Sequence, residues 1–202
     1  MRRFEGDTLL VATHNAGKLE EISALLEPLG IVVTSAKEHG LPEPEEVGTS
    51  FVENARIKAH AAAQATGLPA LSDDSGIEID ALGGAPGVYT ADWAETPDGR
   101  DFALAMRRTW ERIGRSGVEP PFPARFRATL VLAWPDGHEE VFEGKAEGQI
   151  VWPMRGDQGH GYDPIFQPEG FDITFGEMDR WEKNRRSHRA DAFGKLVAAL
   201  GR

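Results

Sequence analysis

The sequence contains no cysteine among its 202 residues. This absence excludes disulfide bonds, thiolate catalysis and cysteine zinc sites, so carboxylates and histidines are the side chains left to bind a metal. Long hydrophobic runs are also missing, and the apolar stretch near the N-terminus, residues 8–12, is too short for a signal peptide or a membrane span. We therefore expect a cytoplasmic protein with no membrane partner.

Positive charge is scarce as well. Lysine and arginine number 22 against 33 aspartates and glutamates, which gives a formal net charge of -11. Binding to a nucleic acid draws its affinity mainly from lysine and arginine at phosphates, so we expect no nucleic-acid partner. A small anionic ligand in a locally basic cleft remains allowed. The hydrophobic content of 40% and charged content of 27% are those of an ordinary globular protein.

The hydrophobic pattern predicts one α/β domain over residues 1–202. Apolar residues at helical spacing predict helices over residues 19–29, 51–67, 102–113 and 193–200. Runs of strand type occur at residues 8–12, 31–35, 70–72, 77–81, 125–134 and 139–151. Because no repeat or low-complexity linker separates these segments, we expect a mixed twisted sheet flanked by helices, with two lobes and a central substrate cleft.

The stretch "VATHNAGKLEE" follows the first predicted strand and opens the first predicted helix. A P-loop needs two glycines with four residues between them, followed by lysine and a hydroxyl residue. Here the first glycine is missing and Leu19 stands at the hydroxyl position, which excludes the P-loop ATPase interpretation. An anion held at a helix N-terminus remains possible, with Gly17 and Lys18 beside it.

Acidic residues gather in two further segments. In "LSDDSGIEID", Asp73 and Asp74 follow a strand-like run, and neighbouring side chains on a strand point in different directions, so at most one would face a given metal. The alternative is an Asx-rich surface turn between two short strands. The loop "LPEPEEVGTS" carries Glu43, Glu45 and Glu46, which are either a solvated charge cluster or, with Asp74, part of a magnesium site completed by phosphate and water.

Two later segments combine glycine, aromatic and basic residues. In "GHGYDPIF", His160 and Tyr162 either flank a base or belong to a glycine-rich turn with an aromatic side chain in the core. In "EKNRRSHRADAF", Ser187 can cap the last helix, which places His188 and Arg189 in its first turn. Cations there oppose the helix dipole, so function rather than stability is indicated, although a basic surface patch is the alternative.

Taken together, these segments resemble the inosine/xanthosine triphosphate pyrophosphatase family. The resemblance rests on "ATHNAGKLEEI", "EEVGTSFVENARIKA", "LSDDSGIEIDALGGAPGVYTADWA", "GHGYDPIF" and "SHR", which occur in the order of the family and cover nearly the whole chain. One such motif would be weak evidence for the family, whereas five motifs in the same order are specific evidence. The resemblance implies Mg2+-dependent hydrolysis of ITP, dITP and XTP to the monophosphate and pyrophosphate, by a homodimer.

The resemblance also implies roles for individual residues. Asp74 would be the catalytic base and, with Glu46, the Mg2+ ligand, while Lys18 would act on the phosphates. The triphosphate would be held by Thr13, His14, Asn15, Ala16, Gly17 and Lys18. Substrate contacts would also come from Ser75, from the base and sugar pocket of His160, Gly161, Tyr162 and Asp163, and from the purine-reading side chains Lys183, His188 and Arg189.

The chain departs from the family pattern at two positions. His14 stands where the family often has glycine, and His160 stands where it usually has phenylalanine, so an imidazole would stack on the base. Two other functions stay open: a pyrophosphatase for other modified nucleoside triphosphates, and a regulator that binds a nucleotide without cleaving it. The acids Glu46, Asp73 and Asp74 disfavour the regulator, because extra negative charge helps to bind an anion only when a metal is present.

Overall fold

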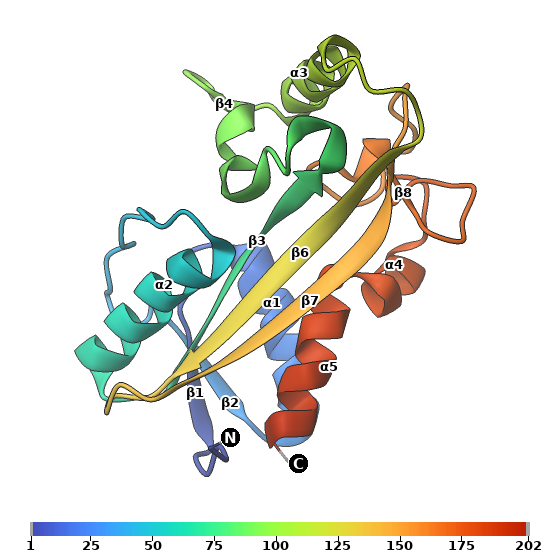
Figure 1. Ribbon diagram of the computed structural model, residues 1–202. Helices are drawn as coiled ribbons and strands as arrows, with labels where there is room; N and C mark the ends of the chain where they lie inside the picture. Colours follow the sequence, from blue (N-terminus) through green and yellow to red (C-terminus); the bar gives the residue numbers. More distant parts are fainter. Residues whose placement is uncertain (1, 201–202) are drawn as a thin grey trace. The chain divides into compact units, whose positions relative to one another are not determined.

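The computed structural model describes residues 2–200 and contains a six-stranded mixed sheet in the order β2-β1-β3-β6-β7-β8 (Figure 1). β1 pairs in parallel with β2 and β3, and β7 pairs antiparallel with β8, which confirms the predicted α/β class with a mixed sheet. The strands of this sheet are β1 (Thr8–Val11), β2 (Val32–Ser35), β3 (Ala70–Ile79), β6 (Phe122–Ala133), β7 (Glu139–Ile150) and β8 (Phe166–Pro168). A separate two-stranded sheet joins β4 (Glu95–Thr96) and β5 (Gly99–Arg100).

Five α-helices occur in the described residues: α1 (Ala16–Leu26), α2 (Phe51–Thr66), α3 (Phe102–Arg115), α4 (Arg180–Arg186) and α5 (His188–Leu200). The predicted start of α2 is confirmed, because Ser50 and Glu53 form both bonds of a capping box and left-handed Gly67 ends the helix. The sequence did not predict α4, a seven-residue helix without an apolar stripe. None of the described helices is both long and apolar enough to cross a membrane.

The central strand β3 differs from the prediction. The sequence suggested two short strands with a turn at "DDSG", but Ala70–Ile79 is one continuous strand of 10 residues. Asp73 and Asp74 are 4% and 9% exposed, so the surface-turn interpretation is wrong. β3 lies between β1 and β6 in the sheet, and a central strand is buried even where its residues are polar.

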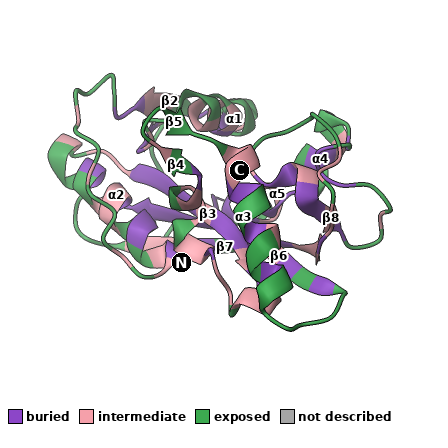
Figure 2. Cartoon of the chain, turned by 90° about the horizontal axis from the view of Figure 1, so that it is seen from above, coloured by how far each residue is buried: buried purple, intermediate pink, exposed green. Residues whose placement is uncertain are grey.

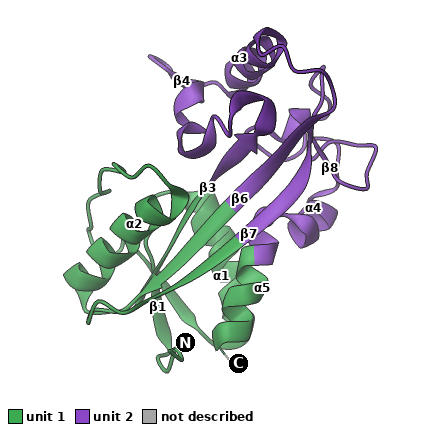
Figure 3. Ribbon diagram, in the orientation of Figure 1, with its two compact units in different colours: residues 1–74, 128–143, 192–202 green, residues 75–127, 144–191 purple. Residues whose placement is uncertain are grey.

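The chain divides into two compact units (Figure 3), of which unit 1 comprises residues 1–74, 128–143 and 192–202. Residues 128–133 of β6 are all buried. Leu130 and Leu132 belong to one apolar cluster with residues of α1 and α5, whereas Val131 and Ala133 belong to another with residues of α2. Successive strand residues point to opposite faces, so in unit 1 helices cover both faces of the sheet.

Unit 2 comprises residues 75–127 and 144–191. Its core contains the buried face of α3, and the helix also has an exposed face (Figure 2). The four arginines of α3 are all exposed. Here the sheet strands alternate between buried apolar and partly exposed charged residues, as expected for a sheet with one solvated face. The charged residues on the strands are Glu78, Arg125, Arg127, Lys145 and Glu147.

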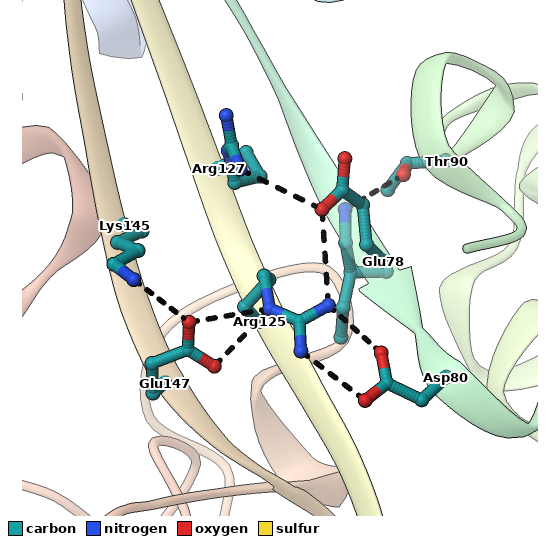
Figure 4. Close-up of polar contacts among 8 residues, drawn as sticks. Glu78, Asp80, Thr90, Arg125, Arg127, Lys145 and Glu147 are labelled. Carbon is teal, nitrogen blue, oxygen red and sulfur yellow. Dashed lines mark hydrogen bonds and ion pairs between the residues drawn. The ribbon is translucent and has the colours of Figure 1, made fainter.

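Arg125 is the centre of this charged group (Figure 4). Its guanidinium donates to both carboxylate oxygens of Asp80 at 2.8 and 3.3 Å and to both oxygens of Glu147 at 3.2 and 3.1 Å. Lys145 Nζ lies 3.3 Å from Glu147, and Arg127 lies 3.9 Å from Glu78. The bond from Arg125 lowers the pKa of Asp80, so the network holds this carboxyl in its charged form.

We expect Arg125→Met to lower the free energy of unfolding by about 1 kcal/mol, because it removes a bidentate contact with Asp80 and a shared Nε–H bond to Glu147 at a partly exposed site. The free energy of unfolding of Arg125→Lys should lie between those of Arg125→Met and the wild type, since lysine keeps the charge but lacks the planar guanidinium group. Urea unfolding measures both, with Arg107→Met on the exposed face of α3 as the matched control. Equal stabilities of Arg125→Met and Arg107→Met would contradict the prediction.

Candidate functional site

The loop between β1 and α1 is built as an open helix N-terminus in unit 1. Asn15 caps α1, with its Oδ1 accepting from the backbone N–H of Lys18 at 3.0 Å. The hydroxyl of Thr13 accepts from the N–H of Asn15 at 3.1 Å. A Cβ at Gly17 would lie 3.3 Å from Asn15 Oδ1, so glycine leaves room for this cap. Residues 14–17 are exposed, and the free N–H groups of such a turn suit an anion.

Beside this loop, the acidic residues of β3 meet two lysines. Lys18 Nζ lies 3.0 Å from Asp73 Oδ2. Lys58 Nζ lies 3.1 Å from Glu46 Oε1 and 3.9 Å from Asp74 Oδ1, and it also donates to the carbonyl oxygen of Asp73 at 2.7 Å. The structure therefore brings together the predicted residues Lys18, Glu46 and Asp74 in one acid–lysine cluster, which also includes Asp73 and Lys58.

Lys58 is the member of the acid–lysine cluster that the sequence analysis missed. It lies on α2, three residues after Ala55 and four before Ala62, and both of these alanines are buried. Its side chain is only 11% exposed. A lysine within the apolar stripe of an amphipathic helix must meet an acid or a carbonyl when the helix packs, and this was the available signal.

Asp74 is the most perturbed acid of the cluster. Burial raises its pKa from the ordinary value of 3.8 to about 6, opposed by the charge of Lys58 and reinforced by that of Glu46. Its Oδ2 is buried and has no hydrogen-bond partner in the described part of the chain. A buried carboxylate oxygen without a partner, next to a second carboxylate, fits a hard cation such as Mg2+.

Residues 2–200 contain no group of three or more histidine, aspartate or glutamate side chains gathered as metal ligands. The carboxylates of Glu46 and Asp74 both lie near Lys58 Nζ, and these two are the donors that we consider for a metal, while the Asp73 carboxylate pairs with Lys18. Mg2+ commonly takes one or two carboxylates and completes its octahedron with water and substrate phosphate, so this donor set suits it.

Unit 2 holds the second group of predicted residues, and Asp163 is its anchor. Asp163 is 3% exposed, and its carboxylate forms an ion pair with Lys183 and accepts from the N–H of His160 at 2.9 Å. Gly159 has a φ of +72°, and a Cβ there would lie 2.1 Å from Asp163 Oδ2. The loop is thus fixed by Asp163, which holds Lys183 in place, while His160 is exposed.

Tyr162 lies in the core of unit 2. It is 1% exposed, its hydroxyl donates to the carbonyl of Thr90 at 3.0 Å, and its ring packs edge-on against Phe102. Burial raises the pKa of this hydroxyl. Of the two interpretations of "GHGYDPIF", the one with an aromatic side chain in the core describes Tyr162 correctly. Its contact with a substrate stays a prediction, as does that of Gly161.

The start of α5 carries the remaining predicted residues. Ser187 Oγ accepts from the N–H of Ala190 at 3.1 Å, which confirms the predicted cap. The His188 ring stacks on Phe126 with centroids 5.0 Å apart, and Arg189 lies 3.4 Å from the Ser75 hydroxyl. Lys183 and His188 are 8% and 7% exposed, so the basic-patch interpretation is wrong for both.

We expect Asp74→Asn to stabilise the protein in metal-free buffer containing EDTA. The folded state binds the Asp74 proton more tightly than the unfolded chain, so ionisation of Asp74 lowers the free energy of unfolding. This loss grows as the pH rises from about 4 to about 6, and it stays constant at higher pH. At pH 8 the gain should be at most about 3 kcal/mol, and it should vanish near pH 4. Thermal unfolding at the two pH values measures it.

Asp136→Asn is the control for this experiment. Its bond with Arg2 lowers the pKa of Asp136, so this variant should lose stability at pH 8, the opposite sign. An Asp74→Asn variant that is less stable than the wild type at pH 8 would contradict the assignment of Asp74 as a desolvated acid.

Comparison with known proteins finds a matching family and close relatives in other organisms. Residues 9–199 match the Ham1 family. A protein of Ruegeria pomeroyi named dITP/XTP pyrophosphatase is 67% identical over 196 residues, which cover 97% of this chain and 96% of that protein. A protein of Mesorhizobium japonicum with the same name is 56% identical over 211 residues, with 98% and 96% covered.

The fold is also that of solved structures. The HAM1 protein from Coxiella burnetii shares 37% identity and a TM-score of 0.90, over 96% of this chain and 98% of that one. The Ham1 protein of Staphylococcus aureus shares 30% identity and a TM-score of 0.86, with the same coverage. The resemblance to the inosine/xanthosine triphosphate pyrophosphatases is thereby confirmed: the chain belongs to the Ham1 family.

Proposed function

We propose that this protein is a hydrolase that converts the deaminated purine nucleoside triphosphates ITP, dITP and XTP to the monophosphate and pyrophosphate. The observation that carries the proposal is the acid–lysine cluster of unit 1, in which Glu46, Asp73 and Asp74 meet Lys18 and Lys58 at 2.7–3.9 Å. The names of relatives that are 67% and 56% identical, both dITP/XTP pyrophosphatases, support the same activity.

The reaction requires water to attack the α-phosphorus while charge develops on the leaving pyrophosphate. We assign the phosphates to residues Thr13 to Lys18, where the exposed N–H groups at the start of α1 and the lysine charge stabilise that developing charge. Asn15 acts there through its cap, which fixes the first turn of the helix. His14 and Ala16 contribute through the loop backbone.

Asp74 is the proposed general base. With a pKa of about 6 it is mostly ionised at neutral pH, yet basic enough to take a proton from the attacking water. Glu46 and Asp74 are the proposed Mg2+ ligands. Bound there, Mg2+ would neutralise charge on the phosphate oxygens. Lys58 positions both carboxylates, and Lys18 stays near Asp73 until a phosphate competes for it.

The purine is assigned to the side chains of unit 2. Hypoxanthine and xanthine present an acceptor oxygen at C6, whereas adenine presents an amino donor. N–H donors are offered by Lys183, His188 and Arg189. They can form hydrogen bonds to the oxygen at C6, but they would be left without an acceptor opposite the amino group of adenine. Ser75 lies beside Arg189, and Asp163 holds Lys183, so both contribute by positioning these donors. His160, exposed on its loop, is the proposed stacking partner of the base.

The remaining features of the proposal follow the resemblance. We propose a cytoplasmic homodimer that acts on a small-molecule nucleotide, with neither nucleic acid nor membrane as a partner. A regulator that binds nucleotide without hydrolysis is disfavoured by Asp74, since a pure anion-binding site gains nothing from a buried carboxylate with an unpartnered oxygen.

A product assay across ITP, XTP, dITP and the four common ribonucleoside triphosphates tests the function. We expect kcat/KM for ITP to exceed that for ATP by a factor on the order of 10⁴, because ATP strands the donors. Released pyrophosphate is measured through added inorganic pyrophosphatase, with Mg2+ present or replaced by EDTA. Equal rates for ATP and ITP would overturn the donor assignment, and absence of pyrophosphate would overturn the activity.

We expect Asp74→Asn to lower kcat by about 10²–10⁴-fold, because it removes the base, while ITP binding stays measurable by calorimetry. Lys58→Met should lower kcat as well, since it leaves Glu46 and Asp74 without their shared cation. Lys195→Met on α5, whose ammonium contacts the Glu143 carbonyl, is the matched control and should retain activity. Full activity of Asp74→Asn would remove Asp74 from the mechanism.

A further inference from the structure

Three phenylalanines pack together in the core of unit 2: Phe126 on β6, Phe166 on β8 and Phe175 in the loop that follows β8. The Phe126 ring lies edge-on to Phe166 with centroids 4.7 Å apart and parallel to Phe175 at 6.0 Å, while Phe166 and Phe175 are 5.0 Å apart. Phe126 is 7% exposed and the other two are fully buried. We call this group the aromatic platform.

Two rings of the aromatic platform each face one purine-reading side chain. The His188 imidazole stacks on Phe126 at 5.0 Å with an angle of 16° between the planes. Lys183 Nζ lies 5.7 Å from the centre of the Phe175 ring, within the range of a cation–π contact. His188 and Lys183 belong to different helices, α5 and α4, yet both rest on this one group of rings.

We propose that the aromatic platform determines the purine preference of the enzyme by fixing the directions in which Lys183 and His188 donate hydrogen bonds. Phe126 and Phe175 are thus positioning residues, which reach the substrate only through the two donors. The inference rests on the proposed function, because it takes Lys183 and His188 to be the donors that face the base.

The physical reason for this preference is the free-energy cost of leaving a buried hydrogen-bond donor without an acceptor. A free lysine has several rotatable bonds and could turn away from an adenine amino group at little cost, so it would discriminate poorly. Lys183 is held at its ammonium by Asp163 and the face of Phe175. His188 is held in one plane by Phe126, which confines its ring nitrogens to directions within that plane. Donors that cannot turn away reject the wrong base more strongly.

The test is Phe126→Leu, which keeps an apolar side chain and removes the ring face. We expect the ratio of kcat/KM for ITP to that for ATP to fall about three- to tenfold, the size of one aromatic stacking contact. The change should lie mainly in a lower KM for ATP, because donors that can turn away no longer penalise the adenine amino group, and kcat for ITP should change less than about twofold, since the acid–lysine cluster is untouched. Phe175→Leu should lower the ratio in the same direction through Lys183.

Phe122→Leu is the matched control. Phe122 lies on the same strand, belongs to the same apolar cluster and is 8% exposed, but its ring packs on Trp110. It should lose similar thermal stability while its ITP-to-ATP ratio stays at the wild-type value. If Phe126→Leu does not fold, Phe126→Met, whose flexible side chain fills an irregular gap in a core more easily, carries the same expectation.

The outcomes separate the two proposals. A wild-type ratio in folded Phe126→Leu or Phe126→Met, or an equal fall in Phe122→Leu, overturns the role of the aromatic platform and leaves the proposed function standing. If the wild-type enzyme has equal kcat/KM values for ATP and ITP, the purine assignment itself is overturned, and the inference with it. A fall in the ratio confined to Phe126 and Phe175 variants supports both.

Discussion

The arrangement of unit 1 depends on the neutralisation of two neighbouring buried aspartates by two lysines from different helices. Asp73 and Asp74 lie in the middle of a six-stranded sheet, where an unpaired carboxylate is costly. Lys18 from α1 contacts the first, and Lys58 from α2 contacts the second. Lys58 compensates the charge of Asp74 only in part, so burial still raises the pKa of this carboxyl. The cost of this burial is the physical basis for expecting a metal there.

The same principle appears in unit 2 with a different solution. Lys183 is buried against a single acid, Asp163, and against an aromatic ring rather than against water. On the solvated face of the sheet, by contrast, Arg125 meets Asp80 and Glu147 at the surface, where each pair contributes little by itself. Buried pairs thus hold the candidate site residues in place, whereas exposed pairs maintain the sheet face.

Much of the fold was predictable because the local signals were strong. The capping box at Ser50, the turn at residues 135–137 and the apolar side of α5 all predicted their elements within a few residues. "DDSG" was misassigned because the local preference of aspartate, serine and glycine for turns was overridden by pairing in the sheet. α4 has no apolar period to detect, since its buried residue is a lysine.

The candidate site was predictable only where a motif marked it. Lys18, Glu46 and Asp74 were named in advance, and the structure brings them together, but Lys58 and Phe126 were not. Lys58 looked like an ordinary charge on a helix, and Phe126 like an ordinary core residue. Lys58 contacts Asp74, 16 positions away in the sequence, and Phe126 contacts His188, 62 positions away. The periodicity of apolar residues predicts local elements but not contacts between such distant residues.

The loop at Gly159 bears on how this chain tolerates its own variation. The glycine has no space for a side chain, because any Cβ would collide with the carboxylate that secures Lys183. The backbone N–H of the next residue, His160, donates to the same carboxylate, and residue 160 is exposed. A substitution at residue 159 would therefore displace Asp163 and the lysine that it holds, whereas the bond from residue 160 comes from the backbone and is available to any residue except proline.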